Sequence, residues 1–184
     1  MTKLGWLFPG QASQKVGMGL DLYNETELGK EYFDTAQEIL NCDIKSIVFQ
    51  GPEEKLKQTE YTQPAIYIVS VILGHLMMDK GIKPNALAGH SLGEVSAFLC
   101  AGSLTLEEAL QLIKYRATFM IEGKGETKTK MSAVLGLDGE AIKKILRDKK
   151  AKFLEAVNMN SPSQTVIAGN ADEIESVKND LNEN

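Results

Sequence analysis

Apolar residues in the first part of the chain recur at the spacings of buried strands and of helices. Residues 4–8 and 85–89 are short apolar runs that end at turn signals, which predicts two buried strands. Residues 25–40 carry apolar side chains three and four positions apart, which predicts an amphipathic helix. Residues 63–80 are apolar on most sides, so this helix should be enclosed by its neighbours. Three further helices are expected over residues 43–49, 92–101 and 105–121.

Polar stretches mark the connections between these elements. Residues 51–59 are charged and polar and are expected as a connection, with Pro64 in the first turn of the apolar helix that follows. Thr105 and Glu108 have the spacing of a capping box, which starts a helix. Residues 123–130 contain no apolar side chain, so we place a domain boundary there, between residues 125 and 126.

The pattern changes beyond this linker. Helices are expected over residues 139–148 and 171–181, and strands over residues 131–137, 154–159 and 164–169. The resulting β-α-β-β-α order is that of a split βαβ or ferredoxin-like unit without its last strand. The sequence therefore predicts two parts, residues 1–125 and residues 126–184.

A candidate nucleophile lies where the second predicted strand meets a helix, in the stretch Gly89-His90-Ser91-Leu92-Gly93-Glu94. The pattern G-x-S-x-G between a strand and a helix is a nucleophile elbow, in which the glycines allow a sharp turn that exposes the serine. The free N–H groups at the helix N-terminus favour the negative charge that develops when a carbonyl is attacked. The motif alone also fits an ordinary tight turn.

Composition narrows the class of protein. The 184 residues are 43% hydrophobic and 24% charged with a net charge of −5, which is typical of a soluble globular protein. Acidic and basic residues are interleaved, which argues against nucleic-acid binding. Cys42 and Cys100 form no metal-binding motif. The apolar run 65–78 is shorter than the roughly 18 residues of a membrane span. With no signal-peptide pattern at the N-terminus, we expect a cytoplasmic protein without membrane partners.

Several motifs occur together in one order along the chain. They are Phe8-Pro9-Gly10-Gln11, Thr62-Gln63-Pro64-Ala65, the elbow around Ser91, Arg116 and Asn158-Met159-Asn160-Ser161-Pro162. With these motifs the chain resembles the family of malonyl-CoA:acyl-carrier-protein transacylases of bacterial fatty-acid synthesis. The resemblance implies an α/β fold, with an incomplete α/β-hydrolase-like large subdomain over residues 1–125 and a ferredoxin-like small subdomain over residues 126–184.

The resemblance also implies a reaction. Ser91 would accept a malonyl group from malonyl-CoA and pass it to the phosphopantetheine thiol of acyl-carrier protein, in a ping-pong reaction that uses no cofactor. The backbone N–H groups of Gln11 and Leu92 would form the oxyanion hole.

Three further residues are assigned to the substrate pocket by the same resemblance. Arg116 would grip the free carboxylate of the malonyl group, a role that suits a guanidinium because it can bind a carboxylate through two parallel hydrogen bonds. Gln63 and His90 would line the pocket. Without the resemblance, Arg116 would be interpreted as a surface arginine paired with a nearby glutamate.

The general base that the resemblance implies has no counterpart at the expected place in this sequence. The resemblance implies a histidine downstream of the small subdomain, and no histidine follows His90 in this sequence. His75 lies among apolar residues and is expected in the core or in a pocket wall. We therefore expect a transacylase domain with impaired activity in this 184-residue chain. The alternatives are a non-catalytic fragment and a serine hydrolase, and Arg116 and Gln11 argue against the hydrolase.

The predicted sheet of the large subdomain is small. It has only the two strands at residues 4–8 and 85–89, whereas sheets usually have about four to six. Because unpaired strand edges and uncovered apolar faces favour association, we expect self-association or a complementing C-terminal segment.

Overall fold

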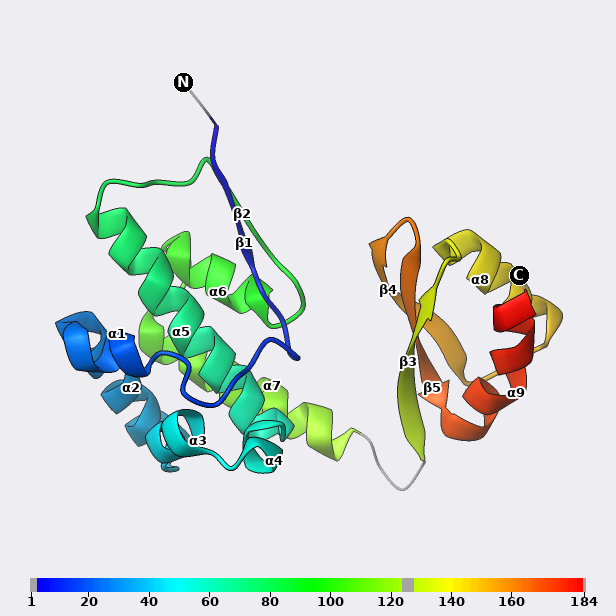
Figure 1. The fold of residues 1–184 in the computed structure, drawn as a ribbon, viewed down its shortest axis with the longest axis horizontal. Helices are drawn as coiled ribbons and strands as arrows, with labels where there is room; N and C mark the ends of the chain where they lie inside the picture. The colour runs from blue at the N-terminus through cyan, green and yellow to red at the C-terminus, as the bar shows by residue number, and fades with distance from the viewer. Residues whose placement is uncertain (1–2, 124–127, 184) are drawn as a thin grey trace. The chain divides into compact units, whose positions relative to one another are not determined.

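The computed structural model describes residues 3–123 and 128–183, and it divides into two compact units (Figure 1). The first unit is Met1–Glu122 and the second is Gly123–Asn184. The predicted boundary between residues 125 and 126 lies outside the described residues.

The first unit contains a parallel strand pair, β1 (Gly5–Phe8) and β2 (Ala86–Gly89), in which Gly5 pairs with Ala86 and Phe8 with Gly89. Both predicted strands are therefore confirmed. The helix that follows β2 packs on both strands, as Figure 1 shows. The helices of this unit are α1 (Leu20–Glu25), α2 (Glu27–Leu40), α3 (Ile44–Gln50), α4 (Glu53–Leu56), α5 (Thr59–Asp79), α6 (Gly93–Cys100) and α7 (Leu106–Glu122).

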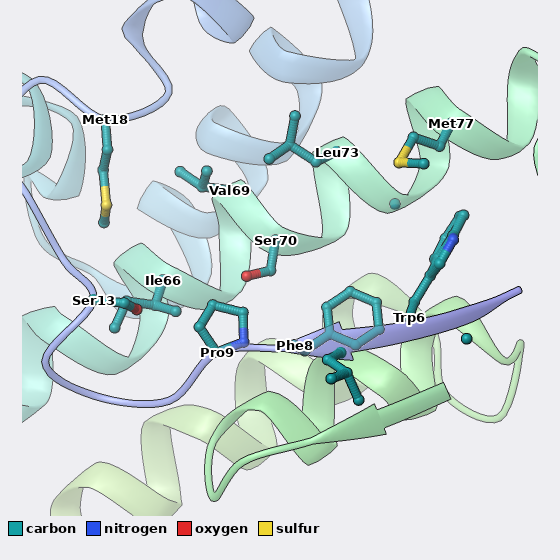
Figure 2. Close-up of a pocket in the computed structure, with 13 residues that line it drawn as sticks. Trp6, Phe8, Pro9, Ser13, Met18, Ile66, Val69, Ser70, Leu73 and Met77 are labelled. Atoms are coloured by element: carbon teal, nitrogen blue, oxygen red, sulfur yellow. The ribbon is translucent and has the colours of Figure 1, made fainter. Parts of the chain in front are cut away.

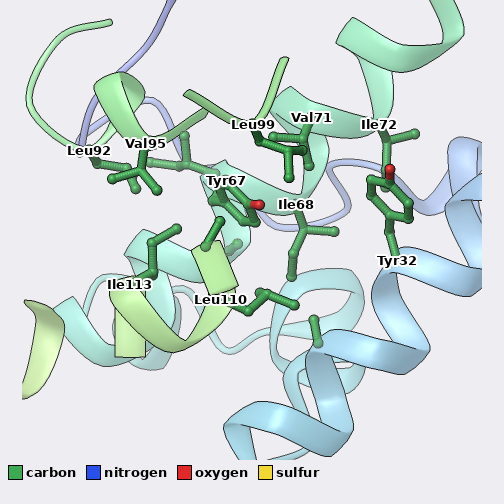
Figure 3. Close-up of a cluster of buried hydrophobic side chains, with 14 of the residues drawn as sticks. Tyr32, Tyr67, Ile68, Val71, Ile72, Leu92, Val95, Leu99, Leu110 and Ile113 are labelled. Atoms are coloured by element: carbon green, nitrogen blue, oxygen red, sulfur yellow. The ribbon is translucent and has the colours of Figure 1, made fainter. Parts of the chain in front are cut away.

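Helix α5 is the centre of this unit, because it contacts α2, α3, α4, α6 and α7. Its side chains Tyr67, Ile68, Val71 and Ile72 are fully buried in the cluster that Figure 3 shows. By length and composition α5 is also able to cross a membrane, but 61% of its apolar window is buried inside the protein. Its apolar surface is thus used for packing, as the sequence predicted for an enclosed helix.

The predicted start of α5 is wrong. The helix begins at Thr59, so Pro64 lies in its second turn, and α4 occupies part of the predicted connection 51–59. The first turn is fixed before the proline is reached: the carbonyl of Gln58 accepts hydrogen bonds from Tyr61 and Thr62, and the Thr62 hydroxyl donates to Leu56. Because proline has no backbone N–H, Pro64 then removes only one backbone hydrogen bond of the helix.

The helix predicted over residues 25–40 is confirmed as α2, and the short helix α1 that precedes it was not predicted. Helix α1 ends at Glu25 and α2 begins at Glu27. Thr26 between them is extended, and its hydroxyl oxygen accepts from the N–H of Gly29 at 2.9 Å. This N-cap satisfies a free N–H of α2 and separates the two helices.

The second unit has the predicted β-α-β-β-α order, with an antiparallel sheet in the order β3-β5-β4. One face of the sheet packs on the two helices around Val134, Ile142 and Ile167. Among the described residues β3 pairs only with β5, so its other edge is open. The elements are β3 (Thr129–Leu135), α8 (Gly139–Asp148), β4 (Leu154–Ser161), β5 (Gln164–Asn170) and α9 (Ala171–Glu183).

Candidate active site

The turn between β2 and α6 has the strand-turn-helix geometry that the motif requires. Ser91 lies in it with φ 54°, in the left-handed region. The flanking glycines cannot be larger: a Cβ on Gly89 would lie 1.9 Å from the carbonyl carbon of Gly93, and one on Gly93 would lie 2.2 Å from the carbonyl oxygen of Phe8. The backbone therefore holds Ser91 exposed at the top of β2.

A chain of hydrogen bonds joins Ser91 to residues of two other helices. Nη2 of Arg116, on α7, donates to Oγ of Ser91 at 2.8 Å. Nη1 of Arg116 donates to Oε1 of Gln63, on α5, at 2.7 Å. Gln63 is fully buried and Arg116 is half-buried. The fold thus brings together three of the residues that the sequence assigned to one site.

The backbone N–H groups that follow Ser91 differ in whether they have an acceptor. The N–H groups of Gly93, Glu94 and Val95 donate to carbonyls three residues back, at 2.9–3.2 Å. Among the residues that the structure describes, the N–H of Leu92 donates to no acceptor, although Leu92 is fully buried. Such a buried donor needs an explanation, because most buried N–H groups have a partner.

The loop after β1 lies against the same turn. A Cβ on Gly10 would lie 2.7 Å from both the carbonyl oxygen and Nδ1 of His90, so only glycine allows this approach. His90 in turn donates its N–H to the carbonyl of Phe8 at 3.0 Å. Gln11 follows Gly10 in an exposed turn, and its N–H donates to no acceptor in the described part of the chain. The structure therefore brings the Gln11 loop and the elbow together.

His75 lies at the interface of α5 and α2. Its Nδ1 is 2.5 Å from the hydroxyl of Tyr32, and the two rings meet edge to face. Burial lowers the pKa of His75, because it disfavours the charged imidazolium. This histidine is therefore partly buried and packs between two helices, which agrees with the expected position in the core or in a pocket wall.

Met120 belongs to the same cluster, and the sequence analysis missed it. Nε2 of Gln63 donates to Sδ of Met120 at 3.0 Å. The available signal was its position, one helical turn after Arg116 on α7. Met120 and Arg116 also line an apolar hollow of about 440 Å³ with Val95, Leu112, Tyr115 and Phe119.

A separate pocket of about 420 Å³ lies between β1 and α5 (Figure 2). Its wall is mostly apolar and includes Leu7, Leu73 and Met77. None of the residues in the hydrogen-bonded chain from Ser91 to Met120 lines it. It is thus a feature of the β1 side of this unit and not part of the elbow site.

An exposed serine on a strand-turn-helix elbow, bonded to a half-buried arginine, is an arrangement suited to a serine nucleophile that forms an acyl ester. The family model described as "Acyl transferase domain" matches residues 5–184, and the chain belongs to this family.

The names of two relatives are more specific than the description of the family. The chain is 39% identical over 178 residues to the malonyl CoA-acyl carrier protein transacylase of Bacillus subtilis (strain 168), with 95% of this chain and 56% of the relative covered. Its Escherichia coli (strain K12) counterpart is 40% identical over 177 residues, with 95% and 57% covered. The chain therefore spans little more than half the length of these relatives, and the predicted resemblance is confirmed.

Solved structures agree with the fold. The acyl carrier protein S-malonyltransferase of Vibrio cholerae O1 biovar eltor matches with a TM-score of 0.92 at 39% identity, with 99% of this chain and 60% of that chain covered. A malonyl-transacylase solved in complex with a type II PKS acyl-carrier protein matches with a TM-score of 0.92 at 36% identity, with 99% and 60% covered. The predicted α/β fold class is thereby confirmed.

Proposed function

We propose that Ser91 carries a malonyl group from coenzyme A to the thiol of acyl-carrier protein. The observation that supports this most is the position of Arg116, which donates to Oγ of Ser91 and to Gln63 at once. A guanidinium 2.8 Å from the oxygen that would be acylated is within reach of a carboxylate on a short acyl group. The names of the relatives specify such a transfer.

The proposed reaction proceeds through an ester. Oγ of Ser91 attacks the thioester carbonyl, a C–O bond forms, and the C–S bond breaks as the coenzyme A thiolate leaves. The carrier-protein thiol then attacks the ester in the same way. The N–H groups of Leu92 and Gln11 would stabilise the negative oxygen of each tetrahedral intermediate. Serine supplies the covalent chemistry, so the proposal includes no cofactor.

The proton that leaves Ser91 needs an acceptor. Arg116, which is bonded to Ser91, only donates hydrogen bonds, and His75 is occupied with Tyr32. Turnover therefore depends on a base outside the bonds described around Ser91. For this reason we propose slow acylation and weak turnover for the 184-residue chain. A cytoplasmic setting, where malonyl-CoA and carrier protein would be available, is part of the same proposal.

Mass spectrometry after incubation with malonyl-CoA tests the proposal. We expect a malonyl ester on the peptide that contains Ser91 and no ester in Ser91→Ala. Ser103→Ala is the matched control, because Ser103 is exposed after α6 and should leave the label unchanged. Labelling that persists in Ser91→Ala contradicts the assignment of Ser91 as the nucleophile. A chain that takes no label favours the non-catalytic alternative, and rapid release of free malonate favours a hydrolase.

A further inference from the structure

Gln63 uses both ends of its side-chain amide. The oxygen Oε1 accepts from Nη1 of Arg116 at 2.7 Å, and the nitrogen Nε2 donates to Sδ of Met120 at 3.0 Å. Arg116 and Met120 are four residues apart on α7, whereas Gln63 belongs to α5. One buried amide therefore bridges two side chains one helical turn apart.

The orientation of this amide is determined by its two neighbours. Arginine has donors only, so Gln63 must present its oxygen to Arg116. The amide nitrogen then points the other way, and because Gln63 is fully buried it has no access to water. A thioether sulfur is a weak acceptor, and it is the group that receives this N–H bond. If the amide turned over, its NH₂ group would face the guanidinium, donor against donor.

We propose that Met120 is a positioning residue of the acyl site. Its sulfur keeps the amide oxygen of Gln63 directed at Arg116, and Gln63 in turn keeps the guanidinium beside Ser91. The inference rests on the proposed function, in which Arg116 binds the carboxylate of the acyl group. It assigns to Met120 an influence on acyl selectivity that acts through Gln63.

A packing role for Met120 makes a different prediction. Met120 is 42% exposed and lines the apolar hollow on α7. Leucine has a similar volume but no acceptor, so Met120→Leu keeps most of the packing and removes the hydrogen bond. Met77→Leu is the matched control, since Met77 is 37% exposed on α5 and lies outside the site. If packing were the only role, neither substitution would change acyl selectivity.

The first experiment measures the initial rates of Ser91 acylation by malonyl-CoA and by acetyl-CoA. We expect the malonyl-to-acetyl ratio to fall about 5- to 100-fold in Met120→Leu, the range expected when a buried donor loses its acceptor. The ratio should not change in Met77→Leu. A Met120→Leu variant that keeps the wild-type ratio overturns the proposal.

A double-mutant cycle tests whether Met120 acts through Gln63. Gln63→Leu alone should lower the malonyl-to-acetyl ratio, because Arg116 loses its amide partner. Adding Met120→Leu to this background should change the ratio no further, since the path that connects Met120 to Arg116 is already broken. An additional loss of the same size as in the wild-type background would show that Met120 acts independently.

A third readout needs no activity. In NMR spectra, the side-chain amide ¹⁵N–¹H signals of Gln63 are assigned by their loss in Gln63→Leu. We expect these signals to shift in Met120→Leu and their protons to exchange faster with solvent. Neither change should occur in Met77→Leu. If the wild-type chain takes no malonyl label, the proposed function fails and these signals still decide the role of Met120. Unchanged Gln63 signals in Met120→Leu overturn the positioning role of Met120.

Discussion

The guanidinium of Arg116 donates one hydrogen bond to the hydroxyl of Ser91 and one to the amide of Gln63. A cation thus lies beside the candidate nucleophile, and within residues 3–123 and 128–183 no carboxylate forms an ion pair with it. A carboxylate that enters the site would exchange a neutral acceptor for a charged one, which makes a stronger hydrogen bond. The site should therefore favour acyl groups that carry a free carboxylate.

Substitution of Arg116 tests this preference. Arg116→Ala should raise the activation free energy of acylation by malonyl-CoA by about 2–5 kcal/mol. This is the usual cost of removing one partner of a buried charged pair. Acylation by acetyl-CoA should change much less. Arg147→Ala, on α8 of the other unit, is the control and should affect neither rate. Equal losses for the two acyl donors would mean that Arg116 is structural.

At the scale of elements, two local devices position the site. The elbow joins β2 to α6 through glycines that have no room for a side chain. Helix α7, which carries Arg116, begins with a reciprocal capping box: the N–H of Thr105 donates to Glu108 at 2.8 Å, and the N–H of Glu108 donates to the Thr105 hydroxyl at 3.2 Å. The predicted capping box is thus confirmed, and it fixes where α7 starts.

Gly93→Ala should destabilise the first unit. The new Cβ would lie 2.2 Å from the carbonyl oxygen of Phe8, so β1 or α6 has to move, at a cost of about 1–3 kcal/mol or more. The midpoint of urea unfolding measures the loss. The control is Gly5→Ala, whose Cβ would have its nearest neighbour at 3.9 Å. Equal midpoints for the two variants would contradict the close approach at the elbow.

At the scale of the whole molecule, apolar surface remains uncovered. Among the described residues β1 pairs only with β2, so its second edge is open. Leu7 on β1 is 84% exposed, and Leu73 on α5 is 47% exposed in the wall of the same pocket (Figure 2). An open strand edge beside an apolar pocket favours pairing with another chain.

The chain should therefore associate with a second copy of itself. Light scattering during gel filtration should give a mass above that of the monomer at micromolar protein concentration. Leu7→Lys should shift the population toward monomer, because a lysine on an edge strand opposes edge pairing. A wild-type chain that stays monomeric contradicts the prediction, whereas association that Leu7→Lys leaves unchanged would locate the interface elsewhere.

Local sequence patterns were sufficient to predict the features that depend on neighbouring residues. Both strands of the first unit, the β-α-β-β-α order of the second and the capping box of α7 follow from periodicity and turn chemistry. The G-x-S-x-G motif predicted the elbow for the same reason, since the steric limit on Gly89 arises within five residues, whereas the limit on Gly93 comes from Phe8 on the neighbouring strand. Periodicity did not predict the short helix α1, and it placed the start of α5 too late, since α5 begins before Pro64.

Contacts between residues far apart in the sequence depend on how the helices pack. Gln63 and Met120 are separated by 57 positions, and no local pattern indicates that a glutamine amide will donate to that sulfur. Their contact exists because α5 and α7 pack side by side, and Arg116 reaches Ser91 because α7 also packs against α6, the helix that follows the elbow. Side-chain hydrogen bonds of this kind depend on distances that packing sets, so only the assembled core determines which polar groups become partners.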